Sequence, residues 1–189
     1  MKRVLVTSIL YTAITALILG IGYPLAMTGI AQVFFKDKAN GQLIVKDGQI
    51  IGSQLIGQSF TGASYFHSRP SAAGTGYDAS SSSGSNLGPT SKALIDRVTT
   101  STATEQGIGP VPIDLVTTSG SGLDPDITPD AAFYQIPRIS RERRIPVAVL
   151  TQLVQAHVQM RQFGLLGEPH VNVLDLNLAL NDLGQKNSN

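Results

Sequence analysis

The sequence contains no cysteine and no tryptophan, and aromatic residues make up only 6% of its 189 residues. Without cysteine the chain has no disulfide bond, no thiolate metal site and no lipid-modified cysteine to anchor it. With few aromatic rings it also lacks the flat apolar surfaces on which sugars stack. The composition therefore argues against a disulfide scaffold, a thiolate metal protein and a sugar-binding module.

Charged residues are scarce as well. They make up 14% of the chain, against about 25% in an average soluble protein. The net charge of +1 gives no basic surface able to neutralise a phosphate backbone, which excludes nucleic acid as a partner. The shortage lies in residues 4–35, which contain no Asp, Glu, Lys, Arg or His. Since about 20 apolar residues cross the hydrocarbon core of a bilayer, this segment predicts a transmembrane helix.

A cleavable signal peptide is the second interpretation of this segment, because Lys2 and Arg3 precede the apolar run. The apolar core of a signal peptide is only about 7–15 residues long, and the small residues here lie too far along for a cleavage site. We therefore predict an uncleaved transmembrane anchor over residues 1–36 and a single domain over residues 37–189. Pro24 is expected to kink or loosen the transmembrane helix.

Positive residues flank the predicted span on both sides. Lys2 and Arg3 favour a cytoplasmic N-terminus, but Lys36, Lys38 and Lys46 lie at the other end. The count of charges is therefore only a weak argument for a C-terminal domain outside the cytoplasm.

Short strands and helices follow the anchor, without an internal repeat. Asp47 and Gly48, between two β-branched runs, predict a hairpin over residues 41–53. Periodicity, caps and breakers then predict a helix from Pro89 and Thr90 to Gly107 and a strand over 113–117. A helix capped by Thr128 follows, which Pro137 is expected to break or bend. The last predicted elements are an amphipathic helix within 146–163 and a strand at 171–173 followed by a helix from Leu174. The pattern indicates a mixed α/β fold of the α+β class, with one transmembrane helix and one small domain of short strands and helices.

No motif in the sequence assembles a catalytic site. It has no G-x-S-x-G turn, no S-x-x-K pair and no phosphate-binding loop, and its three histidines are too scattered for a helix-borne zinc site. Asp124, Asp126 and Asp130 suggest calcium, but two prolines disrupt the loop that calcium needs, and turn or helix capping explains them better. We predict no catalytic residue, no metal site and no cofactor of the chain's own.

Two stretches allow two interpretations each. The four arginines of the first either bind phosphate or carboxylate groups or line a solvated helix face, and the solvated face is favoured: Arg138, Arg141, Arg143 and Arg144. The second, residues 64–89, is rich in Ser and Gly like a linker. Because aromatic and arginine residues interrupt it, we predict an ordered loop instead.

Five blocks of sequence together resemble one family. They are GSQLIGQSF at 52–60, YFHSRPSA at 65–72, YDASSSSGSNLGP at 77–89, DLVTTSGSGLDPDITPDAAFYQIPRI at 114–139 and GEPHVNVLDLNLAL at 167–180. In this order they resemble the KdpC family, the small subunit of the bacterial Kdp potassium-transporting P-type ATPase. The resemblance covers nearly the whole chain.

The resemblance implies an accessory, non-catalytic subunit of the high-affinity, ATP-driven potassium uptake (Kdp) complex. Its partners would be a channel-like potassium-binding subunit, a P-type ATPase subunit, a small membrane peptide and the lipid bilayer. It implies a single-pass protein of the plasma (inner) membrane, with a cytoplasmic N-terminus and an extracytoplasmic C-terminal domain near the potassium entrance. It also implies a role in assembly and as a catalytic chaperone that raises the ATP affinity of the ATPase subunit.

The resemblance also implies site residues. In the family, a glutamine is proposed to contact nucleotide, and it corresponds to Gln135 in this sequence. ATP would then be bound jointly with the ATPase subunit. This role conflicts with the expected topology, because ATP is cytoplasmic and the domain is expected outside. For contacts with partner subunits we predict Tyr65, Phe66, Arg69, Pro70, Gly122, Leu123 and Asp124. The alternative function is a stand-alone, membrane-anchored extracytoplasmic binding protein or enzyme.

Overall fold

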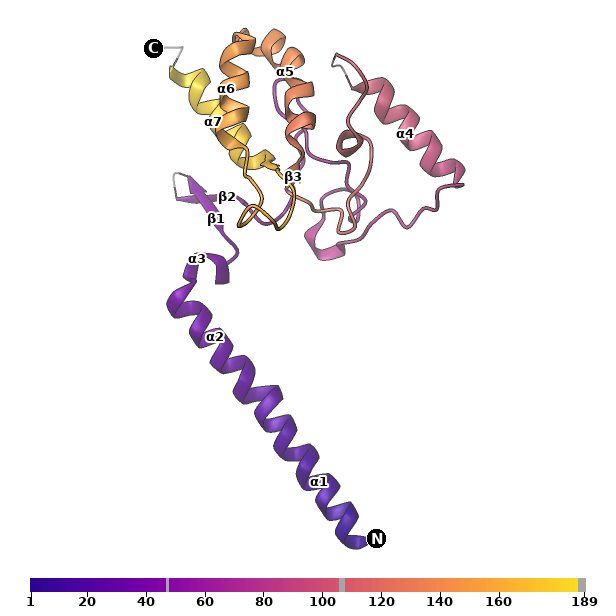
Figure 1. Ribbon diagram of the computed structural model, residues 1–189, viewed down its shortest axis with the longest axis vertical. Helices are drawn as coiled ribbons and strands as arrows, with labels where there is room; N and C mark the ends of the chain where they lie inside the picture. Colours follow the sequence, from indigo (N-terminus) through magenta and orange to yellow (C-terminus); the bar gives the residue numbers. More distant parts are fainter. Residues whose placement is uncertain (47, 106–107, 187–189) are drawn as a thin grey trace. The chain divides into compact units, whose positions relative to one another are not determined.

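The computed structural model describes residues 1–46, 48–105 and 108–186, and packing divides the chain into two units, Met1–Ser53 and Gln54–Asn189. The first unit contains, in order, α1 (Lys2–Leu17), a π-helical turn (Ile18–Gly22), α2 (Tyr23–Phe34), α3 (Lys36–Ala39), β1 (Leu43–Lys46) and β2 (Gln49–Ser53) (Figure 1). The second contains a 3-10 turn (Ala79–Ser81), α4 (Lys92–Thr104), a 3-10 turn (Ile113–Leu115), β3 (Asp126–Ile127), α5 (Pro129–Arg143), α6 (Val147–His157), β4 (Val171–Asn172) and α7 (Val173–Lys186). The predicted boundary between residues 36 and 37 concerns the end of the anchor and stays a prediction.

One long helix fills Lys2–Phe34. It has 33 residues, and none of its most apolar window is buried by the rest of the chain. At about 1.5 Å per residue it is about 50 Å long, more than the ~30 Å of a hydrocarbon core. Among the described residues it is the one helix long and apolar enough to cross a membrane, as the sequence predicts.

The π-helical turn Ile18–Gly22 ends two residues before Pro24. Proline has no N–H group, and its ring crowds the carbonyl four residues earlier, here that of Gly20. A π turn widens the helix where its regular hydrogen bonds are interrupted. The expected loosening of the helix at Pro24 therefore takes this local form.

β1 and β2 pair as an antiparallel hairpin, with Lys46 opposite Gln49. Gly48 in the turn has a φ of +77°, which glycine adopts without a steric penalty. Asp47 lies outside the described residues. The hairpin predicted over residues 41–53 is confirmed.

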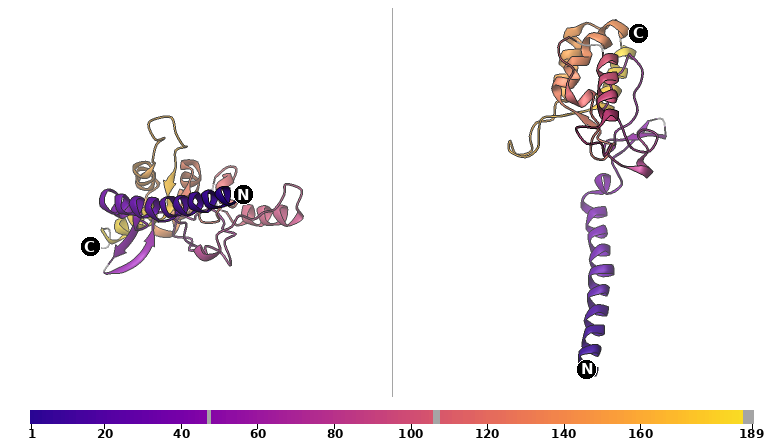
Figure 2. Two further views of the ribbon diagram at one scale, coloured as in Figure 1. Left: turned by 90° about the horizontal axis from the view of Figure 1, so that it is seen from below. Right: turned by 90° about the vertical axis from the view of Figure 1, so that its right-hand side faces the viewer.

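The second unit is built around α5, α6 and α7, with α6 packed against the other two (Figure 1). The largest fully buried apolar side chains of its core are Phe66, Ile139, Leu150, Leu176, Leu180, Val154, Val171 and Val173. β3 and β4 form a short antiparallel ladder that joins the start of α5 to the start of α7. The described helix α4 lies to one side of these helices (Figure 2), and none of its side chains is buried. The expected small domain of short strands and helices is confirmed.

α5 continues through Pro137 to Arg143, so this proline does not break the helix, and the alternative of a bend there stays a prediction. Its start is as predicted, because the hydroxyl of Thr128 accepts a hydrogen bond from the N–H of Ala131 at 3.3 Å. Beyond the proline, the buried side chain of Ile139 packs in the core. This tertiary packing offsets the one hydrogen bond that a proline removes from a helix.

One other predicted element also differs from the structure. The predicted strand 113–117 begins with the 3-10 turn Ile113–Leu115, whose Asp114 carboxylate accepts a hydrogen bond from the N–H of Thr128 at 2.8 Å. Side-chain capping of this kind competes with strand pairing. The amphipathic helix predicted within 146–163 is α6, Val147–His157, and is confirmed.

The helix predicted from Pro89 and Thr90 is α4, and it ends at Thr104. Gly107, its predicted stop, lies outside the described residues. Thus the existence of this helix is confirmed, and its start lies two residues later than the predicted capping residues.

Candidate functional site

Residues 63–67, in the Ser- and Gly-rich part of the chain, are bound by side chains of α5 and α7, and we call them the clamped segment. Asn177 on α7 accepts a hydrogen bond from the N–H of Phe66 and donates one to its C=O, both at 2.9 Å. Gln135 on α5 does the same for His67, accepting at 2.7 Å and donating at 3.3 Å. Each amide takes the place of a paired β-strand, because it satisfies both polar groups of one backbone residue.

Two arginines of α5 bind the other carbonyl groups of the clamped segment. Arg138 donates to the C=O of Ala63 at 2.5 Å and to that of Tyr65 at 3.0 Å. Arg143 donates through Nε to the C=O of Ser64 at 2.6 Å. With the two amides, these side chains bind the carbonyl groups of five consecutive residues, so the segment is fixed along its whole length.

The guanidinium of Arg138 is buried, with only 7% of the residue exposed. Burial lowers its pKa, while the charges of Glu105 and Glu142 act in the opposite direction. Because arginine keeps its proton in proteins, the buried charge depends on its acceptors, which include Oε1 of Gln135 at 2.8 Å. Its Nε has no hydrogen-bond partner among the described residues. Arg138 and Gln135 therefore form one polar network inside the domain.

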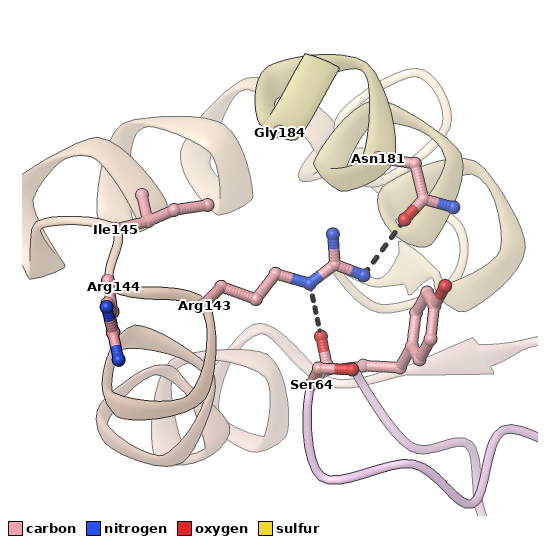
Figure 3. A pocket seen from close by; sticks show the side chains of 7 residues that line it. Ser64, Arg143, Arg144, Ile145, Asn181 and Gly184 are labelled. Atoms are coloured by element: carbon pink, nitrogen blue, oxygen red, sulfur yellow. Dashed lines mark hydrogen bonds between the residues drawn. The ribbon is translucent and has the colours of Figure 1, made fainter. Parts of the chain in front are cut away.

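Arg143 lies in an open pocket of about 610 Å³ (Figure 3). Its guanidinium carbon is 4.6 Å from the centre of the Tyr65 ring, and its NH2 group donates to Oδ1 of Asn181 at 2.9 Å. The pocket is lined by Ser64, Tyr65, Arg143, Arg144, Ile145, Asn181 and Gly184. Of the four clustered arginines, two bind the clamped segment and the other two, Arg141 and Arg144, are exposed. Neither interpretation of the cluster anticipated this division.

Gln135, the residue predicted to contact nucleotide, is only 1% exposed. Its Oε1 accepts from the N–H of His67 and from Arg138, and its Nε2 donates to the carbonyl groups of His67 and Ala131. Its amide is therefore engaged within the domain at both ends. A nucleotide contact stays a prediction, and it requires an exchange of these hydrogen bonds.

A second cluster joins the loop around Arg69 to the loop around Asp124. The NH1 group of Arg69 lies 3.3 Å from Oδ2 of Asp124, and its NH2 group donates to Oγ1 of Thr117 and the C=O of Thr118, each at 3.4 Å. The hydroxyl of Tyr77 donates to the C=O of Arg69 at 2.7 Å. Burial raises the pKa of Tyr77, so this hydroxyl keeps its proton. The fold thus brings together two predicted contact residues that are 55 positions apart.

Gly122 belongs to the same junction and leaves no room for a side chain. Its φ is +68°, and a Cβ atom would lie 2.5 Å from the carbonyl oxygen of Ser83 and 2.8 Å from the amide nitrogen of Ala73. The hydroxyl of Ser71 donates to the C=O of Gly122 at 2.6 Å. Serine hydroxyls therefore connect residues 64–89 to the rest of the domain, which agrees with an ordered loop rather than a linker.

The residues predicted to contact partner subunits fall into two groups. Phe66, Gly122 and Leu123 are buried, and Tyr65, Arg69, Pro70 and Asp124 are partly exposed. The buried residues hold the loops in place, since the C=O of Leu123 accepts a hydrogen bond from the N–H of Gly57 at 2.7 Å. Only the partly exposed residues offer atoms to a partner in this conformation, and the contacts themselves stay predictions.

Three carboxylates meet beside β3. Burial is the main cause that raises the pKa of Asp126, and the charges of Asp124 and Asp175 raise it further. His170 and a hydrogen bond from Asn172 act in the opposite direction. The carboxylate of Asp124 accepts a hydrogen bond from the N–H of Asp126 at 3.1 Å, which agrees with the turn-capping interpretation. Among the described residues, no three metal-ligating side chains form a group that fits a metal ion.

Sequence reasoning missed the two asparagines of α7. Asn177 and Asn181 stand four residues apart, on the helix face that also buries Val173 and Leu180. A polar amide at a core position is a detectable signal, because buried polar groups require a partner. Its partner, Phe66, lies 111 residues away, and the spacing of the sequence alone does not identify it.

Comparison with known proteins places this chain in a family. The family model described as K+-transporting ATPase, c chain (KdpC), matches residues 5–182. The chain is 61% identical to the potassium-transporting ATPase KdpC subunit of Acidobacterium capsulatum, over 94% of this chain and 97% of that one. It is 57% identical to the protein of the same description from Koribacter versatilis, over 95% of each chain. The chain therefore belongs to the KdpC family, the c chain of the K+-transporting ATPase.

Proposed function

We propose that the chain is an accessory, non-catalytic subunit of an ATP-driven potassium uptake complex, needed to assemble it. The observation that carries this proposal is the helix Lys2–Phe34, whose apolar window finds no burial within the chain. A helix of this kind requires lipid or other membrane helices around it. The relatives in the comparison are described as subunits of the potassium-transporting ATPase, which supports other ATPase chains as its neighbours.

The orientation in the membrane is part of the proposal. The N-terminus lies in the cytoplasm, and the domain lies outside, against the channel-like potassium-binding subunit. Lys2 and Arg3 at the N-terminal end support this orientation, although lysines flank the other end as well. The rigid clamped segment supports a role of the domain as a fixed surface, because a preorganised surface loses little entropy on binding.

The effect on ATP is the further part of the proposal. The chain raises the ATP affinity of the ATPase subunit through contacts within the complex, and Gln135 contacts the nucleotide directly only if its bonds to the clamped segment are exchanged. The engagement of this amide inside the domain makes the indirect route the simpler of the two. Both routes leave phosphoryl transfer to the ATPase subunit.

Copurification tests assembly. A tag on the full-length chain, expressed with the other chains of its potassium transporter, is expected to recover the channel-like and ATPase subunits from detergent-solubilised membranes. Removal of this chain is expected to reduce recovery of the other subunits as one complex. Recovery of the tagged chain alone would contradict the proposal and favour the stand-alone binding protein or enzyme.

Thiol labelling tests the orientation, because the chain has no cysteine of its own. Ala103, exposed on α4, is changed to cysteine in the otherwise unaltered chain. A maleimide that cannot cross the plasma membrane is expected to label A103C in intact spheroplasts, without permeabilisation. The cysteine-free chain is the control for background. Labelling that requires permeabilisation would place the domain in the cytoplasm.

A further inference from the structure

The hairpin of β1 and β2 exposes aliphatic side chains on one face. Leu43 and Val45 alternate along β1, and Ile50 of β2 is the cross-strand partner of Val45, so the three share a face. These residues are 51%, 60% and 64% exposed. Among the residues of β1 and β2, all of which the structure describes, no apolar side chain is buried. The hairpin therefore has an apolar face that the described part of the chain leaves uncovered.

The other face of the hairpin is more polar. Lys46 and Gln49 form the next cross-strand pair after Val45 and Ile50, and neighbouring pairs of a ladder point to opposite faces. Ile44, also on this second face, is only partly exposed. The most exposed apolar side chains of the hairpin are therefore gathered on one side, as in amphipathic segments that lie in the interface of a membrane.

The hairpin follows the long apolar helix after one short turn (Figure 1). α3 and residues 40–42 make up the connection between α2 and β1. The side-chain amide of Asn40 exchanges two hydrogen bonds with that of Gln32 near the end of α2, at 3.2 and 3.4 Å. The hydroxyl of Ser53, at the end of β2, donates to the C=O of Gly41 at 2.6 Å. These bonds join the turn to the helix and the hairpin to the turn, so the hairpin stays close to the end of the helix.

The end of α2 indicates where the boundary of the bilayer lies. Val33, Phe34 and Phe35 are all exposed, and their burial in hydrocarbon is favourable. Lys36 follows directly, and a lysine at the end of a span extends its charge to the headgroups. A helix longer than the hydrocarbon core tilts to keep its apolar residues in lipid. The hairpin therefore begins at the level of the headgroups.

The composition of the hairpin favours lipid over a protein as its cover. Residues 36–53 contain three lysines and two aspartates, but no arginine, methionine or aromatic residue. The centres of protein interfaces are enriched in arginine, methionine and aromatic residues and depleted of lysine. Aliphatic side chains with lysines beside them instead suit the boundary between acyl chains and headgroups, where the lysine reaches water or phosphate. Phospholipid is thus the occupant that fits this face.

We propose that the β1–β2 hairpin is a second membrane contact of the chain, with Leu43, Val45 and Ile50 inserted among phospholipids. The proposal rests on the proposed function in one respect, because it requires the helix Lys2–Phe34 to cross the membrane. The inserted face lies at the boundary of headgroups and acyl chains, where amphipathic segments reach a depth of about 5–10 Å. The chain then leaves the bilayer at the end of β2 rather than at the end of α2.

The test uses single-cysteine variants of the full-length chain, which has no cysteine of its own, assembled with the other chains of its transporter in nanodiscs of phosphatidylethanolamine and phosphatidylglycerol. Val45→Cys and Ile50→Cys report on the apolar face, and Gln49→Cys on the opposite face is the matched control. Each thiol carries a fluorescent dye that is quenched by phospholipids with a spin label on the acyl chain. The cysteine-free chain in the same complex gives the background.

We expect quenching at Val45→Cys and Ile50→Cys to be at least about twofold stronger than at Gln49→Cys, because only the first two lie among the acyl chains. Equal quenching at the three positions, or none above background at Val45→Cys and Ile50→Cys, would overturn the membrane contact.

Photo-crosslinking identifies what covers the apolar face. A benzophenone maleimide on Val45→Cys in the same complex is expected to give an adduct with phospholipid. Adducts only with a protein chain, a second copy of this one included, would overturn the proposal, as would the absence of any adduct. Failure of the membrane anchor itself is a different result, in which alkaline carbonate extracts the wild-type chain from membranes. A chain that resists this extraction without quenching at the hairpin would overturn the second contact alone.

Discussion

The strongest structural prediction concerns Asn177, which satisfies both backbone groups of Phe66. Asn177 is 2% exposed and Phe66 is fully buried, so Asn177→Ala leaves one N–H and one C=O without a partner or water. Each buried unsatisfied group costs about 1–3 kcal/mol, which gives about 2–6 kcal/mol for the pair. At an unfolding entropy of about 2.1 cal/mol/K per residue, a domain of roughly 130 residues loses about 3–4 °C per kcal/mol. The expected fall in Tm is about 7–20 °C.

The assay is a far-ultraviolet circular dichroism melt of the full-length chain in detergent, in which the transmembrane helix remains helical and the transition reports the domain. Gln152→Ala is the control, because Gln152 is exposed on α6 and a substitution there is expected to shift Tm by no more than about 2 °C. A Tm shift for Asn177→Ala as small as that of the control would show that the hydrogen bonds of Asn177 to Phe66 do not stabilise the domain. The same result would show that water reaches Phe66.

Three further predictions follow from the site. Gly122→Ala forces a side chain into a left-handed position against two backbone groups, so a loss of at least about 3 kcal/mol is expected in the same melt. The pKa of Asp126 is raised in the folded domain, so its neutral form stabilises the fold fully below the unfolded pKa, and this stabilisation is lost as the pH rises through the folded pKa. Asp126→Asn, which has no charge to lose, is therefore expected to raise Tm at about pH 7 and to leave it unchanged at about pH 3. Gln135→Ala is expected to raise the KM for ATP of the complex more than Asn177→Ala, at equal loss of stability, if Gln135 contacts nucleotide. Equal KM values would assign Gln135 to the fold alone.

Local sequence rules predicted the elements that depend on local chemistry. The uncharged run predicted the long apolar helix Lys2–Phe34, the Asp-Gly pair predicted the hairpin, and Thr128 predicted the start of α5. They allowed a break at Pro137, where distant packing outweighs a local breaker and the helix continues. They failed at residues 113–117, where a buried carboxylate makes a capping bond to a residue 14 positions away.

The candidate site was the part least accessible to sequence reasoning. Tyr65, Phe66 and Gln135 were selected, but nothing in their spacing relates one to another. In the structure Gln135 binds the clamped segment across 68 residues of sequence. The arginines of α5 bind carbonyl groups of the same segment that lie 73 or more residues earlier in the chain. Hydrogen bonds of such sequence separation depend on the packing of α5 and α7 against α6, which local patterns do not encode.

The side chains that bind the clamped segment explain why the start of the Ser- and Gly-rich stretch is ordered although it contains little to bury. An extended segment needs partners for its backbone groups, and a sheet is the usual source. Here the side chains of two helices supply them, so the segment needs neither strand pairing nor large side chains of its own, apart from Phe66. Three of the sequence blocks that resemble the family, 65–72, 114–139 and 167–180, contribute the two sides of this clamp.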